Sequence, residues 1–161
     1  MIGFRMWRFA LFAGLGCGAG VDDASDRLAP GRIGVAASQA GTTVWSERGL
    51  GDRSSVLWVH EGGEPSVLVD DDGNPDRPGL SPEGGRVAYV SAATGLASVW
   101  VVRVATKERL QLTNVGLRAG NGRPEHWVPP PDNADWRFDG NALSWTSAMG
   151  PTSVELPVDW R

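Results

Sequence analysis

A segment in the middle of the chain returns, in shortened form, near its end. PGLSPEGGRVAYVSAATGLASVWVV runs from Pro78 to Val102, and WRFDGNALSWTS follows near the C-terminus. Residues of the first copy are matched 56 positions later: Leu80, Glu83, Gly84, Val87, Tyr89 and Ser91 by Trp136, Asp139, Gly140, Leu143, Trp145 and Ser147. In both copies an acidic residue and a glycine precede an alternating strand. The repeat predicts a chain built from copies of one unit, which stack to bury their apolar faces.

The composition of the 161-residue chain favours β structure. It contains 22 Gly, 11 Pro and eight Trp but a single Tyr. Frequent turn residues between short β-branched runs predict an all-β domain. We expect strands over 33–38, 42–47, 55–61, 66–70, 86–91, 98–102 and 153–158, with a hairpin turn at Glu61-Gly62-Gly63-Glu64.

The middle copy resembles the repeat of TolB-type β-propellers, a WD-like family in which a Ser-Pro-Asp-Gly turn leads into an apolar strand that ends in Ser. The matching parts are Ser81-Pro82-Glu83-Gly84, the strand 86–91, the turn Thr94-Gly95, the strand 98–102 and the run 109–114. The resemblance implies an exported protein of the bacterial envelope that binds protein partners and carries out no reaction.

The first unit is a looser copy of the middle one. Val56-Leu57-Trp58-Val59 aligns with Val99-Trp100-Val101-Val102, 43 residues on, a spacing that suits one four-stranded blade. The propeller-like domain 32–161 then divides into units at about 32–76, 77–115 and 135–161, with a Pro-rich insert over 116–134. Closed propellers have roughly four to eight blades. We therefore predict an all-β fold, a partial (about three-blade) β-propeller of antiparallel sheets, in which Trp45, Trp58, Tyr89, Trp100 and Trp145 are largely buried.

The N-terminus has the layout of a secretory signal. Arg5 and Arg8 precede an apolar stretch, and Cys17, the only cysteine, follows it. Gly14-Leu15-Gly16-Cys17 resembles the lipobox of bacterial lipoproteins, in which the cysteine is acylated. We predict a signal peptide over 1–17, a flexible tether over 18–31, and a periplasmic or outer-membrane protein that touches the membrane only through a lipid anchor. An ordinary secretory leader and an uncleaved, membrane-associated leader are the alternatives.

Few residues suit catalysis or metal binding. His60 and His126 are the only histidines, and no Gly-x-Ser-x-Gly elbow is present, so we expect no catalytic residue and no cofactor. A weak calcium candidate consists of Asp72, Asn74, Asp76 and Glu83, at the first, third, fifth and twelfth positions of a loop. Arg77 occupies the place where such a loop needs Gly. A turn between units, stabilised by Asp and Asn side chains, is the preferred interpretation.

The charge and the aromatic residues bear on the partners. A net charge of −4 argues against nucleic acid, because phosphate binding needs clustered positive charge. Trp127 and Trp136, beside the prolines, are candidate contacts for a protein partner or, alternatively, covers for an open sheet edge. Open edges also allow self-association. We predict a non-catalytic exported binding or scaffold protein. The alternatives are a degenerate or accessory propeller fragment of a secreted peptidase-type hydrolase and a calcium-dependent surface adhesin.

Overall fold

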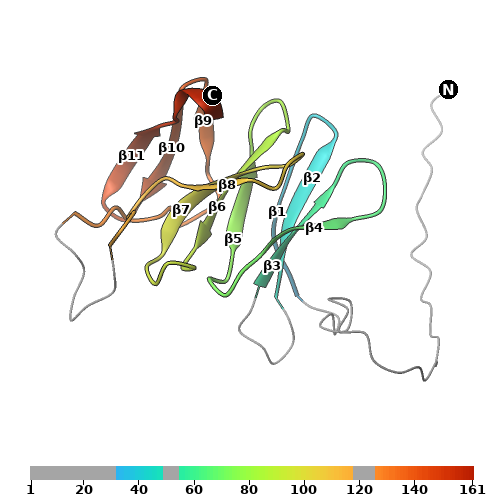
Figure 1. The fold of residues 1–161 in the computed structure, drawn as a ribbon, viewed down its shortest axis with the longest axis horizontal. Helices are drawn as coiled ribbons and strands as arrows, with labels where there is room; N and C mark the ends of the chain where they lie inside the picture. Colours follow the sequence, from blue (N-terminus) through green and yellow to red (C-terminus); the bar gives the residue numbers. More distant parts are fainter. Residues whose placement is uncertain (1–31, 49–54, 118–125) are drawn as a thin grey trace.

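Three antiparallel sheets lie side by side in this protein (Figure 1). The computed structural model describes residues 32–48, 55–117 and 126–161, and in these ranges the chain is all β apart from one short 3₁₀ helix. Each sheet follows the order of the chain, so each is a meander of neighbouring strands. Cys17, the predicted signal peptide and tether, and the centre of the Pro-rich insert lie outside the described residues.

The strands of each sheet are consecutive in the sequence. Sheet 1 consists of β1 (Arg32–Gln39), β2 (Thr42–Arg48), β3 (Ser55–His60) and β4 (Ser66–Asp70). Sheet 2 consists of β5 (Asp76–Leu80), β6 (Arg86–Ser91), β7 (Ser98–Arg103) and β8 (Arg109–Gln111). Sheet 3 consists of β9 (Arg137–Asp139), β10 (Ala142–Ser147) and β11 (Gly150–Glu155), and the 3₁₀ helix η2 (Val158–Trp160) follows it.

Most of these strands agree with the sequence-based expectation, including the hairpin between β3 and β4. The short strands β5, β8 and β9 were not among the expected strands, and β11 begins earlier than expected. β5 was not expected, because Pro78 and the acidic run before it are typical of a turn. The strand accommodates Pro78 through an irregularity between Asp76 and Gly79, where Arg77 has a positive φ of 54°. The last strand begins at Gly150 and not at Ser153, because Gly150, with a φ of 106°, closes a tight hairpin with Ser147.

Sheet 2 is covered on both faces. One core lies between sheets 1 and 2 and contains Val44, Leu57, Val59, Leu68, Val69, Val87, Tyr89, Val102 and Val104. A second core, between sheets 2 and 3, contains Ala88, Val99, Val101, Leu143, Trp145, Leu156 and Trp160. Successive residues of β6 therefore enter different cores, because side chains alternate across a strand. This explains why β6 is a nearly unbroken apolar run.

Three of the five aromatic residues expected in the core are only half-buried. Tyr89 and Trp145 are buried, but Trp45, Trp58 and Trp100 are not. Trp45 pairs with Trp58 across β2 and β3, as Tyr89 pairs with Trp100 across β6 and β7. Trp58 thus corresponds to Trp100, 42 residues on, and the expected spacing of 43 was wrong by one. A slip of one residue moves every side chain to the other face of the sheet.

The C-terminal segment joins sheets 2 and 3. Leu156 and Trp160 are buried in the second core. The guanidinium of Arg103 lies 4.2 Å from the centre of the Trp160 ring, and Arg86 donates a hydrogen bond to the Trp160 carbonyl. The segment therefore closes one side of the second core with both apolar and cationic contacts.

Candidate interaction faces at the two ends of the stack

The outward face of sheet 1 carries a stacked pair of tryptophans. Its side chains, all half-buried, come from β2, β3 and β4: Thr43, Trp45, Val56, Trp58, His60 and Val67. We call this set the sheet 1 end face. Trp45 and Trp58 stack with ring centroids 6.4 Å apart and planes inclined by 12°. Large rings in such an arrangement are frequent anchors of protein interfaces.

The same pair occurs inside the molecule. Tyr89 and Trp100 stack in sheet 2 with centroids 6.4 Å apart and planes inclined by 25°, and they contact the core between sheets 1 and 2. Sheet 1 buries Tyr89 completely and covers Trp100 in part. The sheet 1 end face therefore occupies, in the first repeat, the position of a surface that a neighbouring sheet covers in the second. It is the face on which a further sheet would pack.

Trp58 differs from Trp100 in its hydrogen bonding. The indole nitrogen of Trp100 donates to the Ser91 carbonyl at 3.3 Å. The indole nitrogen of Trp58 is shielded from solvent and has no hydrogen-bond partner in the part of the chain that the structure describes. An unpaired N–H of this kind costs free energy that a nearby acceptor would recover.

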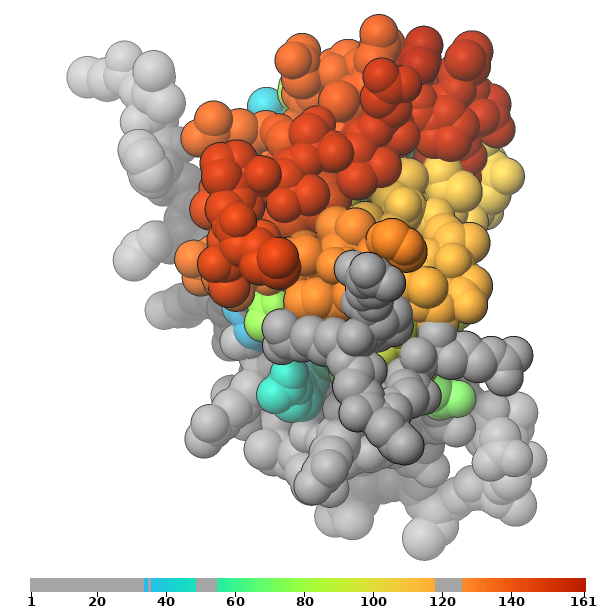
Figure 2. Space-filling view, turned by 90° about the vertical axis from the view of Figure 1, so that its left-hand side faces the viewer, coloured from blue at the N-terminus to red at the C-terminus, as the bar shows by residue number. Residues whose placement is uncertain are grey.

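Sheet 3 ends the stack on the opposite side, which faces the viewer in Figure 2. Its outward face has a hollow of about 280 Å³ between β9, β10 and β11. The lining residues are Asp135, Arg137, Ser144, Trp145, Thr146, Pro151, Thr152 and Ser153. We call this feature the sheet 3 hollow. Small hydroxyl side chains make up half of its lining, so the hollow offers space and hydrogen-bonding groups together.

Arg137 brings a positive charge to the hollow. It is exposed, and it makes no ion pair and no ring contact with any residue that the structure describes. In contrast, Arg86 and Arg103 lie over the rings of Phe138 and Trp160. The guanidinium of Arg137 is thus available to an aromatic ring or a carboxylate from outside.

Of the two tryptophans predicted as partner contacts, Trp136 has a structural position. Its indole nitrogen donates to the Arg77 carbonyl at 2.7 Å, and its ring lies 5.8 Å from that of Trp145. It covers β5, which agrees with the alternative that it acts as a cover. Trp127 is half-buried, and its neighbour Val128 exchanges two hydrogen bonds with the Asn114 side chain.

The weak calcium candidate is not assembled as a site. Asp76 accepts hydrogen bonds from Ser46 and from the backbone N–H of Arg77, while Asp72 and Asn74 are exposed. Glu83 bonds Arg86 at 2.9 Å. No group of three His, Cys, Asp or Glu residues in the described ranges is placed to hold a metal ion. Partial burial would raise the pKa of Glu83, but hydrogen bonds from its own backbone N–H, Ser81 and Arg86 lower it overall.

An ionic network links the connection between β4 and β5 to β8. Asp71 pairs with Arg109 at 2.9 Å and accepts hydrogen bonds from the Ser91 hydroxyl and the Gly73 N–H. Tyr89 lies beside this network, and burial raises the pKa of its hydroxyl. Each polar group of Asp71 is satisfied within the fold, so the network holds sheet 2 to the preceding segment and offers no reactive group.

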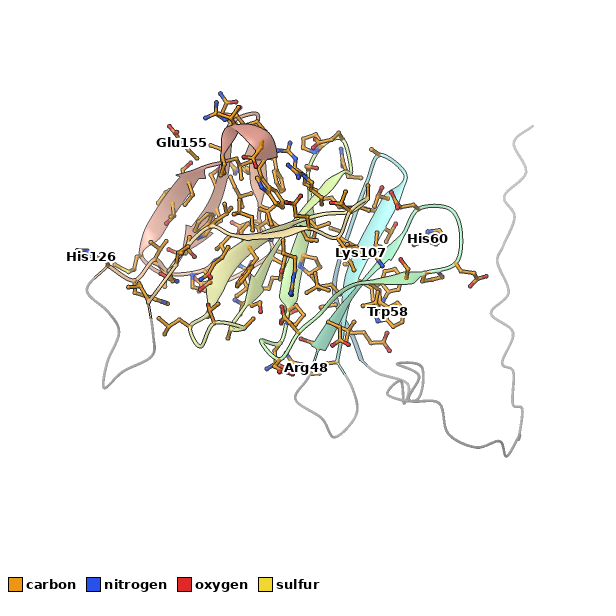
Figure 3. All side chains as sticks on the ribbon, in the orientation of Figure 1. Arg48, Trp58, His60, Lys107, His126 and Glu155 are labelled. Atoms are coloured by element: carbon orange, nitrogen blue, oxygen red, sulfur yellow. The ribbon has the colours of Figure 1, made fainter. Side chains whose placement is uncertain are left out.

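The histidines do not form a common site. His60 lies on sheet 1 and His126 at the opposite end of the molecule (Figure 3).

Among the described residues, no helix is long and apolar enough to cross a membrane.

Comparisons with known proteins agree with the fold. TolB from Acinetobacter baumannii superposes with a TM-score of 0.51 and 15% identity, over 76% of this chain and 29% of that one. A protein assigned as TolB from Agrobacterium tumefaciens has a TM-score of 0.46 and 19% identity, over 77% of this chain and 48% of that one. An acylaminoacyl peptidase from Pyrococcus horikoshii has a TM-score of 0.42 and 18% identity, over 74% and 21%.

The fold is a partial β-propeller. The chain spans less than half the length of each of these three structures. No protein-family model and no curated protein matches the sequence. At this identity the likeness to TolB concerns the architecture alone, and the three sheets correspond to three blades.

The sheet 1 end face was missed by the sequence analysis, which placed Trp45 and Trp58 in the core. A signal was present. Val44 alternates with Trp45 in β2, and Leu57 and Val59 alternate with Trp58 in β3, so both faces of each strand carry an apolar side chain. Only the pairing of the strands shows which of these faces meets sheet 2.

Proposed function

We propose that this protein is a non-catalytic binding or scaffold module of the cell envelope that acts through protein–protein contacts. The observation that carries the proposal is the sheet 1 end face, where a stacked Trp45–Trp58 pair repeats a pair that is covered within the fold. Within the stack, another sheet packs on this kind of surface, so its exposure at the end of the stack favours association with a partner. The distant likeness to TolB supports the scaffold architecture.

The chemistry of the described residues supports the same proposal. The polar groups that are drawn together, such as Asp71, Arg109 and Ser91, are paired with one another. A hydrolase would need a nucleophile, a base and a carboxylate within hydrogen-bonding reach. The two histidines, which could act as the base, lie at opposite ends of the molecule (Figure 3).

A photo-cross-linking residue in place of Trp45 tests the proposal in living cells. We expect ultraviolet light to join position 45 to a protein, because the proposed partner covers this ring. A matched variant carries the same residue at Thr94, in an exposed turn of sheet 2. If position 45 gave no more adduct than position 94, the binding function would be wrong.

The envelope location needs its own measurement. Mass spectrometry of the mature N-terminus, with Cys17→Ala as control, is expected to show an acylated Cys17. An unmodified terminus beyond Cys17 would leave simple secretion. The hypothesis of a peptidase-associated fragment predicts in addition a peptidase domain encoded directly downstream in the same reading frame, and a stop followed by an unrelated gene would contradict it.

A further inference from the structure

We propose that the layer covering the sheet 1 end face is a second copy of this chain, and that two copies close head to tail into a ring of six sheets. In this ring the sheet 1 end face of each copy occupies the sheet 3 hollow of the other. The inference rests on the proposed binding function and names the partner.

The internal packing of the repeat predicts where Trp45 would bind. Tyr89, the counterpart of Trp45, shares the first core with Val44, Leu57 and Val59 on the facing side of sheet 1. In these strands Val44 pairs with Val59 and Ser46 with Leu57. The corresponding pairs in sheet 3 are Ser144 with Ser153 and Thr146 with Pro151.

These four residues of sheet 3 all line the hollow. The sheet 3 hollow is therefore the repeat counterpart of the surface that receives Tyr89 in sheet 1. It continues, at the end of the stack, the interface that sheets 1 and 2 and sheets 2 and 3 already make within the chain. A second copy that packs in the same register would bring its Trp45 into this hollow.

The sizes of the side chains agree with this pairing. Val44 shares a core with Tyr89, whereas the smaller Ala88, its counterpart in sheet 2, shares a core with the larger Trp145. The third counterpart, Ser144, is also small and leaves space. Well-packed layers alternate large and small residues across the contact. An indole is the expected occupant of the hollow.

The polar groups are complementary as well. Arg137 pairs with Ser144 in the register of β9 and β10, so its unpaired guanidinium lies level with the place where the Trp45 ring would enter. Tryptophan is the best aromatic ring for cation–π contacts, and arginine is the more frequent cation in them.

The number of sheets favours two copies. The described residues of one chain form three sheets, fewer than the roughly four to eight of closed propellers, and those of two chains would form six. The two ends of the stack differ, so the contact is head to tail, and such a contact either closes into a ring or grows into a filament. A two-fold axis along the centre of the propeller closes it with two identical interfaces.

Light scattering on the purified full-length protein tests the ring. We expect the mass of two chains, and Trp45→Ser should weaken dimerisation by about 30-fold or more, as loss of a Trp anchor does. Ser144→Trp, which fills the hollow, should give monomers although it leaves the Trp45 face intact. Val115→Ser, which removes an apolar side chain that is 67% exposed in a loop, is the control and should remain dimeric. Circular dichroism checks that each variant is folded.

Mixing the variants tests the head-to-tail arrangement. A Trp45→Ser chain still has an intact hollow, and a Ser144→Trp chain still has an intact aromatic face. The mixture should therefore form heterodimers through one interface, although each variant alone is monomeric. A dimer that Ser144→Trp leaves unchanged would overturn the arrangement, as would a ladder of larger oligomers in place of a closed pair.

The photo-cross-linking residue at position 45 separates this inference from the proposed function. Adducts within residues 135–153 of a second copy would support the ring. A wild-type monomer that cross-links through position 45 to another envelope protein would overturn the ring but keep the binding function. A monomer that gives no adduct would overturn both.

Discussion

The indole of Trp136 lies directly on Gly79 of β5, so close that a Cβ atom at Gly79 would come within 2.1 Å of Trp136 Cδ1. The same ring donates a hydrogen bond to the Arg77 carbonyl. Trp136 begins the third unit, and Gly79 belongs to the first strand of the second, so this contact connects consecutive repeats. The contact shows that Trp136 has a structural role in holding the two repeats together.

Gly79→Ala tests this contact. The added methyl group must displace the indole or the strand, so we expect the free energy of unfolding to fall by about 1–3 kcal/mol. Urea denaturation measures it. Gly63→Ala is the matched control, because nothing lies within 4 Å of a Cβ atom there. In a Trp136→Ala background the cost of Gly79→Ala should largely disappear, and an unchanged cost would contradict the explanation.

The turns of this protein can be predicted from its sequence, whereas the faces that its strands bury cannot. Gly84 and Gly140 have positive φ values of 76° and 45°, a conformation that favours glycine. The Glu83-Gly84 and Asp139-Gly140 turns could therefore be predicted from the glycines in the sequence. β5 could not, because Pro78 indicates a break and the bulge that tolerates it depends on pairing with β6.

The end faces required the structure for a different reason. Trp45 and Trp58 are as apolar as core residues, and both sides of β2 and β3 carry apolar side chains. Which side meets sheet 2 depends on the register between distant strands, and no local pattern encodes it. The sheet 3 hollow was equally hidden, because Ser144 and Ser153 are ordinary strand residues until their pairing places them opposite each other.

Asp71 should stabilise the fold mainly through the hydrogen bonds that it accepts from two uncharged donors. Asp71→Ala removes the acceptor of the Ser91 hydroxyl and the Gly73 N–H and also the ion-pair partner of Arg109. We therefore expect the free energy of unfolding to fall by about 2 kcal/mol. Asp71→Asn keeps an acceptor oxygen and loses only the ion pair with a half-exposed arginine, which contributes about 0–1 kcal/mol. The neighbouring Asp72→Ala, at an exposed position, is the control. Equal losses for the Asn and Ala variants would show that the charge dominates.

Trp160→Ala should destabilise the protein strongly. The ring is 5% exposed and contacts Arg103, so its removal is expected to cost about 3–5 kcal/mol in the free energy of unfolding. Val158, two residues earlier, is 79% exposed, and Val158→Ala should stay within about 0.5 kcal/mol of wild type. Thermal unfolding of the two variants side by side measures the difference. Similar midpoints would mean that the C-terminal segment does not close the second core.

Tyr89 should make the protein less stable at high pH. Burial raises the pKa of its hydroxyl, the nearby charge of Arg109 opposes this effect in part, and the hydroxyl has no hydrogen-bond partner among the described residues. The unfolded chain ionises at about pH 10. Because the pKa of the folded state is the higher of the two, the stability that Tyr89 contributes is complete below about pH 10 and is lost as the pH rises above it.

Tyr89 is the only tyrosine, so the ultraviolet absorbance of tyrosinate reports on this residue alone. We expect tyrosinate to appear together with the loss of the near-ultraviolet circular dichroism of the tryptophans. Tyr89→Phe should lie within about 1 kcal/mol of wild type at neutral pH, since it removes an unpaired hydroxyl, and should retain more of its stability at alkaline pH. The variant also serves as the control for every other effect of alkaline pH on the protein. Tyrosinate that forms at about pH 10 in a protein that is still folded would contradict the buried position of Tyr89.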